Sequence, residues 1–166
     1  MAIYHLSVKI ISRSSGRSSV AAAAYRSGDT LTNEWDGLTH DYSKKHWIEH
    51  TEIILPPNAP EEFKDRSTLW NAVEMAEKSS NAQLAREVEL ALPIELSPQE
   101  RLSLVRLYIK ENFVSKGMCA DFAIHNPPLT DDKGRPIDLN GNPTNDPDKM
   151  IFRNPHAHIL LTMRPL

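Results

Sequence analysis

The stretch Asn154-Pro155-His156-Ala157-His158-Ile159-Leu160-Leu161-Thr162 places two histidines one residue apart at the start of an apolar run. A short apolar run that follows a proline is typical of a buried strand. Side chains two residues apart on a strand project from the same face of the sheet. The stretch therefore predicts a strand that presents both imidazoles on one face.

A second apolar run, from Cys119 to Ile124, ends in His125. If the two runs pair as neighbouring strands, His125 comes to lie beside His156 and His158. Three neutral imidazole nitrogens can hold a divalent metal ion and leave coordination positions open for phosphate oxygens, as a catalytic site needs. We therefore predict a metal site formed by these three histidines.

Working outward from these two runs, three further stretches have strand patterns. Residues 46–55 stop at a pair of prolines and residues 86–92 stop at one, and proline ends a strand because it lacks the backbone donor. Residues 3–11 have the alternation of a half-buried strand, with these apolar residues predicted on its buried face: Tyr4, Leu6, Val8 and Ile10.

Helix patterns occupy the stretches between the strands. A short helix is predicted through the four alanines of residues 21–24, capped by Ser18 or Ser19 and closed by Gly28. Residues 67–85 have apolar positions at loose helical spacing. The segment Ser97-Pro98-Gln99-Glu100 has a capping residue, a helix-initiating proline and a capping-box glutamate, which predicts a helix to about residue 116.

This order predicts an α+β fold with a mainly antiparallel, five-stranded sheet and helices packed on one of its faces. A chain of 166 residues suits a single domain, so we expect residues 1–166 to form one unit. Residues 126–155 are rich in Pro, Gly, Asp and Asn and are predicted to form a long, partly mobile loop, because loops of this length inside compact domains are usually functional or disordered.

The composition restricts the kind of protein. The single cysteine, Cys119, excludes a disulfide framework and a thiolate zinc cluster, so histidine and carboxylate remain as metal ligands. No apolar run approaches the roughly 20 residues of a membrane span, and the first residues lack the pattern of a secretory signal. We therefore expect a cytoplasmic protein.

Basic charge is concentrated near the amino terminus. The net charge of -3 argues against a protein that coats nucleic acid nonspecifically. Residues 1–28 nevertheless contain no acidic residue and four basic ones: Lys9, Arg13, Arg17 and Arg26.

Two acidic residues, Glu87 and Glu89, share one face of the strand predicted over residues 86–92. They could belong to a solvated face. If that face also bears the histidines, a carboxylate there could orient a ligand imidazole or accept the proton of an attacking hydroxyl.

Three stretches together resemble the MobA/MobL family of plasmid relaxases, of MOBQ type, within the HUH endonucleases. They are residues 1–26, which contain Tyr25, residues 86–93 and residues 154–162. The resemblance covers nearly the whole chain. It implies an antiparallel sheet on which a metal and a tyrosine meet at one face, and it implies that the chain is the amino-terminal part of a longer protein.

The resemblance also implies roles for residues. Tyr25 matches the nucleophile that nicks transfer-origin DNA, forms a 5'-phosphotyrosine link and releases a 3'-hydroxyl for later religation. The three histidines match ligands of a divalent metal ion, Mg or Mn in the cell, with Zn, Ni or Co as substitutes in vitro. Glu87 is the first candidate to accept the tyrosine proton and Glu89 is the second.

The same resemblance implies the partners. They are single-stranded or nicked transfer-origin DNA, relaxosome accessory proteins and a coupling protein. The basic residues Lys9, Arg13, Arg17 and Arg26 would then surround the tyrosine and hold the DNA backbone. The alternatives are a replication initiator or transposase of the same superfamily, a non-enzymatic single-stranded DNA-binding module, and a metal-dependent hydrolase or oxygenase.

Overall fold

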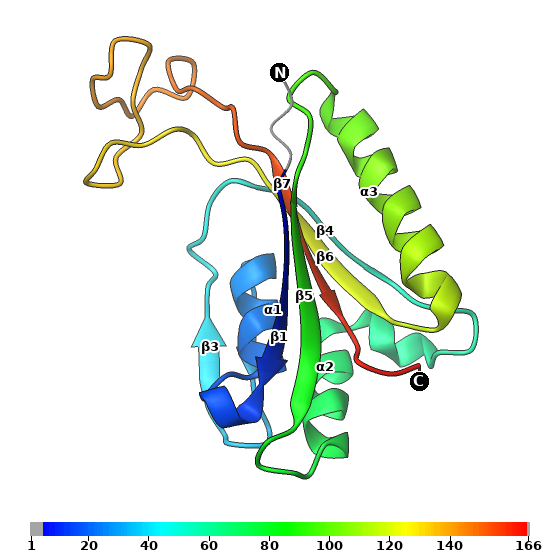
Figure 1. Cartoon of the computed structure of the whole chain (residues 1–166). Helices are drawn as coiled ribbons and strands as arrows, with labels where there is room; N and C mark the ends of the chain where they lie inside the picture. Colours follow the sequence, from blue (N-terminus) through cyan, green and yellow to red (C-terminus); the bar gives the residue numbers. More distant parts are fainter. Residues whose placement is uncertain (1–4, 166) are drawn as a thin grey trace.

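The computed structural model describes residues 5–165, which form a five-stranded sheet with helices and a separate small hairpin (Figure 1). The sheet order is β1-β5-β7-β6-β4, and every neighbouring pair is antiparallel. The predicted α+β fold with its five-stranded antiparallel sheet is therefore confirmed. The strands are β1 (Leu6–Ser12), β4 (Ile48–Ile54), β5 (Gln83–Ala91), β6 (Ala120–His125) and β7 (His156–Leu161).

Two of the three α-helices, α1 (Ser19–Ser27) and α3 (Pro98–Asn112), begin where the capping residues predict. The Ser18 side chain accepts a hydrogen bond from the first turn of α1, and Gly28 closes that helix with a φ of 75°. A complete capping box opens α3. Residues 5–165 also contain three short 3-10 helices: η1 (Arg13–Ser15), η2 (Glu61–Lys64) and η3 (Val114–Lys116).

The helix predicted over residues 67–85 is too long. Helix α2 (Arg66–Ala76) ends at Glu77, whose backbone is extended, and β5 takes up the chain from Gln83. Leu84, which fitted the loose helical pattern, is buried as part of that strand. The polar residues 29–45, for which no element was predicted, contain a hairpin of β2 (Thr30–Thr32) and β3 (Thr39–Asp41).

The helices cover both faces of the sheet, which corrects the prediction of a single covered face. Helices α1 and α2 pack with one core cluster, to which β7 contributes Leu160. Residues of α3 pack with a second cluster, to which β7 contributes Ile159 and Leu161. Because neighbouring side chains of a strand point to opposite faces, β7 is buried from both sides and lies at the centre of the fold.

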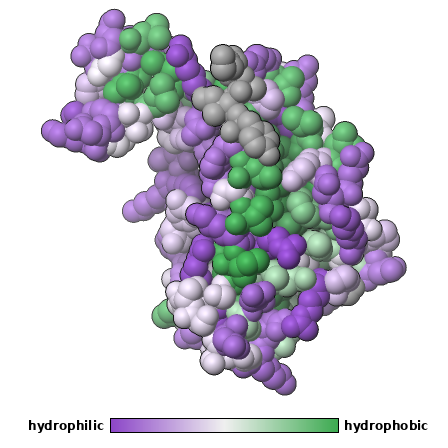
Figure 2. All heavy atoms as spheres, viewed as in Figure 1, coloured by the Kyte–Doolittle hydropathy of each residue, from purple (hydrophilic) through white to green (hydrophobic). Residues whose placement is uncertain are grey.

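The apolar face predicted as buried on the first strand is instead exposed. Leu6, Val8 and Ile10 have exposed fractions of 43%, 56% and 38%. Strand β1 is at the edge of the sheet and pairs with β5, and Val8 lies opposite Val88, which packs in the same cluster as α3. Figure 2 shows hydrophobic residues gathered along this strand. Tyr4, predicted on the same face, lies outside the described residues.

The segment of residues 126–155 connects β6 to β7 and extends away from the sheet (Figure 1). Within this segment the structure has two isolated β-bridges, one between Thr130 and Pro136 and one between Ile137 and Pro143. Among the described residues, no helix combines the length and the apolar character that crossing a membrane requires.

Candidate metal centre and nucleophile

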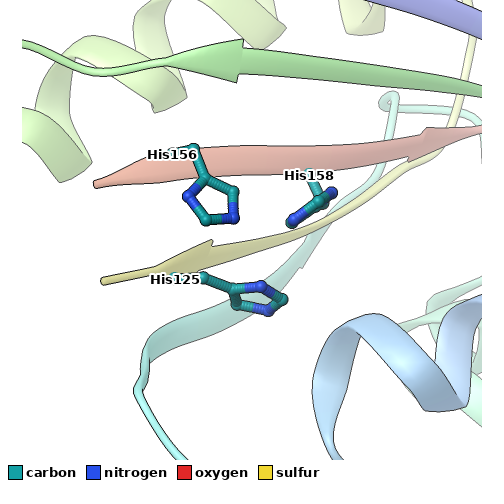
Figure 3. A group of neighbouring side chains, drawn as sticks. All are labelled: His125, His156 and His158. Carbon is teal, nitrogen blue, oxygen red and sulfur yellow. The ribbon is translucent and has the colours of Figure 1, made fainter. Parts of the chain in front are cut away.

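Three histidines from two adjacent strands converge on one face of the sheet (Figure 3). His125 ends β6 and pairs in register with His156 at the start of β7, and His158 follows two residues later. The ring centroids lie 4.6 Å apart for His125 and His158, 4.8 Å for His156 and His158, and 5.6 Å for His125 and His156. One nitrogen from each ring lies within 4.8 Å of the other two. The structure therefore brings together the three predicted ligands.

The protonation of these rings suits a metal site. Burial lowers the pKa of His125 to about 3 and also lowers the pKa of His156, so both are neutral at pH 7. His125 Nε2 donates to the Arg26 carbonyl at 2.7 Å, and His156 Nδ1 donates to the Asn154 carbonyl at 2.8 Å. Each ring keeps its other nitrogen free for a metal.

His158 faces the carboxylates of the neighbouring strand, with Glu87 and Glu89 each 3.8 Å from its Nδ1 atom. Its Nδ1 atom is buried and has no hydrogen-bond partner in the described part of the chain. Buried polar atoms without a partner are uncommon in folded proteins and call for an explanation. A carboxylate beside this nitrogen can orient the ring and leave its other nitrogen for a metal, and a trio of imidazoles fits a divalent ion of the first transition row, or Mg with additional oxygen ligands.

Tyr25 lies near the end of α1, and its side chain is 45% exposed. It lines a cavity of about 400 Å³ together with the three histidines. Its ring packs edge-on against Tyr42, with the centroids 5.2 Å apart. The predicted nucleophile and the predicted metal ligands therefore face the same cavity.

Two cations contact the Tyr25 ring. Lys45 Nζ lies 3.6 Å from the ring centroid and donates to the Tyr25 carbonyl at 2.6 Å, and the Arg26 guanidinium lies 4.6 Å from the centroid. Burial, together with the charge of Arg26, lowers the pKa of Lys45 to about 8. Two basic side chains therefore face the phenol ring, and one of them, Arg26, is also paired with Glu87.

Glu87 lies beside the histidine cluster and is only 4% exposed. Its carboxylate accepts a hydrogen bond from Arg26 Nε at 3.0 Å, and it lies 3.7 Å from Arg17 and 3.8 Å from His158 Nδ1. Burial alone would raise the pKa of this carboxyl, but His158 and Arg26 outweigh burial and lower it to about 2. Glu87 is therefore an anion held between two arginines and an imidazole.

Glu89, two residues further along β5, has a more open environment. Its side chain is 35% exposed, and Oε2 lies 3.8 Å from His158 Nδ1. It lines the cavity that Tyr25 and the histidines share. Both predicted acidic residues therefore lie on the face that bears the histidines.

The four basic residues of the amino-terminal segment divide into two groups. Arg17 and Arg26 meet at Glu87, and the exposed Lys9 lies opposite Glu87 in the strand register. Arg13 does not join them. Its guanidinium is 12% exposed, stacks on Trp35 and donates to the Glu74 carboxylate and to backbone carbonyls of the segment after α2. These bonds tie η1 to α2 and occupy both terminal nitrogens of Arg13, and its Nε is buried, so the guanidinium is not presented to a DNA backbone.

The sequence profile of the MobA/MobL family matches residues 17–166. The chain belongs to the MobA/MobL family. Its relatives include the mobilization protein MobL of Acidithiobacillus ferridurans, 42% identical over 98% of this chain, and the conjugal transfer protein TraA of Rhizobium radiobacter, 38% identical over the whole chain. This chain spans 43% of the length of that MobL and 14% of the length of that TraA.

A solved structure has the same fold as this MobA/MobL chain. It comes from work on the molecular basis of vancomycin resistance transfer in Staphylococcus aureus. The two chains share 33% sequence identity and superpose with a TM-score of 0.79. The superposition covers 99% of this chain and 72% of the other.

Two features of this MobA/MobL site were absent from the sequence prediction. Lys45 lies in a polar stretch without periodicity, so nothing in the sequence marks it as a neighbour of Tyr25. Trp47, two residues later, lines the same cavity as the histidines. Its place there depends on the pairing of β4 with β6, which brings the start of β4 beside His125 and which the sequence around Trp47 does not indicate.

Proposed function

We propose that this domain is a relaxase that nicks one strand of plasmid transfer-origin DNA with Tyr25 as the nucleophile. The observation that carries the proposal is that Tyr25 lines the same cavity as His125, His156 and His158. The names of the relatives, a mobilization protein and a conjugal transfer protein, support it. Single-stranded or nicked transfer-origin DNA is the proposed substrate, with relaxosome accessory proteins and a coupling protein as partners.

The proposed reaction is a transesterification at phosphorus. The Tyr25 phenol oxygen forms a bond to the scissile phosphorus while the bond from phosphorus to the 3'-oxygen breaks. The products are a 5'-phosphotyrosine and a free 3'-hydroxyl, which takes up a proton. A divalent ion, Mg or Mn in the cell, would supply Lewis-acid polarisation of the phosphate oxygens when bound by the three histidines.

The phenol must lose its proton as it attacks. The surroundings of Glu87 and Glu89 differ in how well each carboxylate could accept that proton. A carboxylate with a pKa of about 2, held by two arginines, is a weak proton acceptor, so Glu87 is better suited to orient the ligand ring of His158. Glu89 lines the reaction cavity and is the proposed acceptor. The sequence ranked Glu87 above Glu89 as the proton acceptor. Our proposal reverses that ranking, because the pairing of Glu87 with Arg17 and Arg26 is a tertiary contact that the sequence does not reveal.

The cations around Tyr25 serve the same step. Lys45 and Arg26 lie over the phenol ring and favour the negative charge that develops on its oxygen. Arg17, with a side chain 41% exposed, is placed to hold a phosphate of the incoming strand. Lys9, exposed on the neighbouring strand, extends this basic surface.

A labelling experiment tests the nucleophile. The protein is incubated with Mn and a single-stranded transfer-origin oligonucleotide that carries a label at its 3' end. We expect a denaturant-resistant adduct that keeps the 3' label, whereas a 5' label is released with the 3'-hydroxyl product. Tyr25→Phe should form no adduct. Tyr42→Phe, which alters the ring packed against Tyr25, is the matched control and should retain it.

Two results would contradict the proposal. An adduct that persists in Tyr25→Phe means that another residue is the nucleophile. Cleavage by the unaltered protein without any adduct favours the hydrolase alternative.

Calorimetric titration with Mn tests the metal ligands separately from cleavage. His156→Ala and His158→Ala should each lose measurable binding, whereas His40→Ala, a histidine of the β2–β3 hairpin, should bind Mn as the unaltered protein does. Unchanged affinity in His156→Ala or His158→Ala would remove the proposed site.

A further inference from the structure

Trp47 has an unusual backbone conformation at the rim of the metal cavity. Its φ is 69°, and within residues 5–165 it is the one non-glycine residue with positive φ. Such a conformation costs free energy for a bulky side chain and persists where the surrounding contacts enforce it. Strain of this kind concentrates at functional sites, so the outlier is a reason to ask what Trp47 does.

The backbone of Trp47 is fixed directly beside the metal ligands. Its carbonyl accepts a hydrogen bond from the Asn126 N–H at 2.9 Å, and the next residue, Ile48, pairs in register with His125. Trp47 is therefore held immediately before the start of β4, beside the end of β6 that bears His125.

The side chain of Trp47 meets a second aromatic ring from a distant segment. The rings of Trp47 and Phe152 have centroids 5.4 Å apart and planes inclined by 58°. Phe152 belongs to the long segment of residues 126–155. The exposed fractions of the two side chains are 38% and 36%, and neither belongs to the two core clusters. Core packing therefore does not account for this pair.

The cavity beside these rings is lined by two basic side chains and by one carboxylate, that of Glu89. Trp47 lines it together with Arg26, Lys45 and the phenol of Tyr25. Proteins that bind single-stranded nucleic acid combine a positive groove for the backbone with exposed aromatic rings on which bases stack. Both parts are present within one cavity here.

We propose that Trp47, supported from one side by Phe152, stacks on an unpaired nucleobase next to the scissile phosphate. This inference rests on the proposed function and extends it, because it identifies how the site holds a base as well as a phosphate. Stacking needs only the flat face of the base, so the contact tolerates any of the four bases. It also gives the long segment of residues 126–155 a function, which is to place Phe152 against Trp47.

The test compares two ligands of equal length in a protein that cannot cleave. Fluorescence anisotropy measures the affinity of Tyr25→Phe for a short oligothymidylate and for a chain of abasic nucleotides. Adding Trp47→Ala should reduce the preference for the oligothymidylate by about 5- to 150-fold, the range expected for the loss of one stacked base. Affinity for the abasic chain should stay the same.

Two further variants separate stacking from damage to the fold. Trp35→Ala removes another exposed tryptophan, which packs on Arg13 outside this cavity, and should leave the preference unchanged. Trp47→Phe keeps an aromatic ring and should retain most of the preference. Mn affinity should be equal in the Trp47 variants and the parent, because no metal ligand is altered.

The outcomes distinguish this inference from nicking. If Trp47→Ala keeps the full preference, or if the parent shows no binding or no preference for bases, the stacking inference is overturned. A Trp47-dependent preference in a protein whose unaltered form makes no covalent adduct would uphold stacking and contradict the nicking proposal.

Discussion

The negative charge of Glu87 should be a main source of stability, because it joins β5 to the helix that carries Tyr25. The carboxylate is 4% exposed and holds Arg26 and Arg17. Its pKa falls from 4.5 to about 2 in the folded protein, since His158 and Arg26 outweigh the opposing effect of burial. One pKa unit corresponds to about 1.4 kcal/mol, so this ionisation contributes about 3 kcal/mol to the free energy of unfolding at pH 7.

The sign of the pH dependence follows from the lowered pKa. The folded state binds the proton less tightly than the unfolded state, so the contribution is complete above the unfolded pKa near 4.5. It falls as the pH decreases toward 2, where the folded state takes up the proton as well. At pH 3, about 1 kcal/mol should remain.

Urea unfolding of the protein in the presence of a chelator measures this contribution without metal binding. Glu87→Gln keeps the shape of the side chain and removes its charge. We expect it to lower the free energy of unfolding by about 3 kcal/mol at pH 7 and by about 1 kcal/mol at pH 3. Glu111→Gln, on the exposed surface of α3, is the control and should have little effect at either pH. A Glu87→Gln deficit that is equal at both pH values would refute the reasoning.

Three other predictions concern stability and reactivity. Gly37→Ala and Gly28→Ala should each lower the free energy of unfolding by about 1–2 kcal/mol because φ is 74° and 75° at these positions, and the new Cβ at position 28 should add little because the atom it meets at 2.7 Å is the flexible end of the Ile48 side chain; urea unfolding measures both, and a much larger loss in Gly28→Ala would contradict this. Asp121→Asn removes the buried charge that pairs with Arg66 and should lower stability by about 3–5 kcal/mol while calorimetry shows unchanged Mn affinity; a stable variant would contradict this role. Burial raises the pKa of Cys119 to about 11, so a thiol reagent should react with it only after denaturant is added, and rapid reaction of the folded protein would contradict its burial.

The sequence predicted correctly those helix ends that are determined by hydrogen bonds between residues close together in the chain. The capping box at Ser97 and the left-handed glycine at position 28 determine helix ends through bonds within a few residues, and the structure confirms both. The three histidines were found for a similar reason. Strand periodicity fixes the relation of His156 to His158, and the pairing of two apolar runs then places His125 opposite them.

Features that depend on distant contacts were not predicted. The exposed face of Leu6, Val8 and Ile10 had the alternation of a buried face, and its exposure depends on β1 being an edge strand that α3 does not cover. The burial of Arg13 depends on Glu74, which lies 61 residues later. Periodicity contains no information about either contact.

The covering of both sheet faces did have a signal in the sequence. Residues 157 and 159–161 of β7 are all apolar, so apolar side chains point to both faces of this strand. A strand that is apolar on both faces is typical of a sheet covered on both sides. The predicted single covered face was therefore inconsistent with the strand from which the rest of the fold was inferred.

The alanines of α1 explain how Tyr25 and the three histidines come to share one cavity. Ala22, Ala23 and Ala24 are buried and have minimal side chains, so the backbone of α1 approaches the sheet closely. The approach is close enough for the Arg26 carbonyl, one residue after Tyr25, to accept a hydrogen bond from His125. A larger residue at the buried alanines would displace the Tyr25 backbone and this histidine together. The position of the Tyr25 phenol and the orientation of the His125 ring are therefore set by the same contact between helix and sheet.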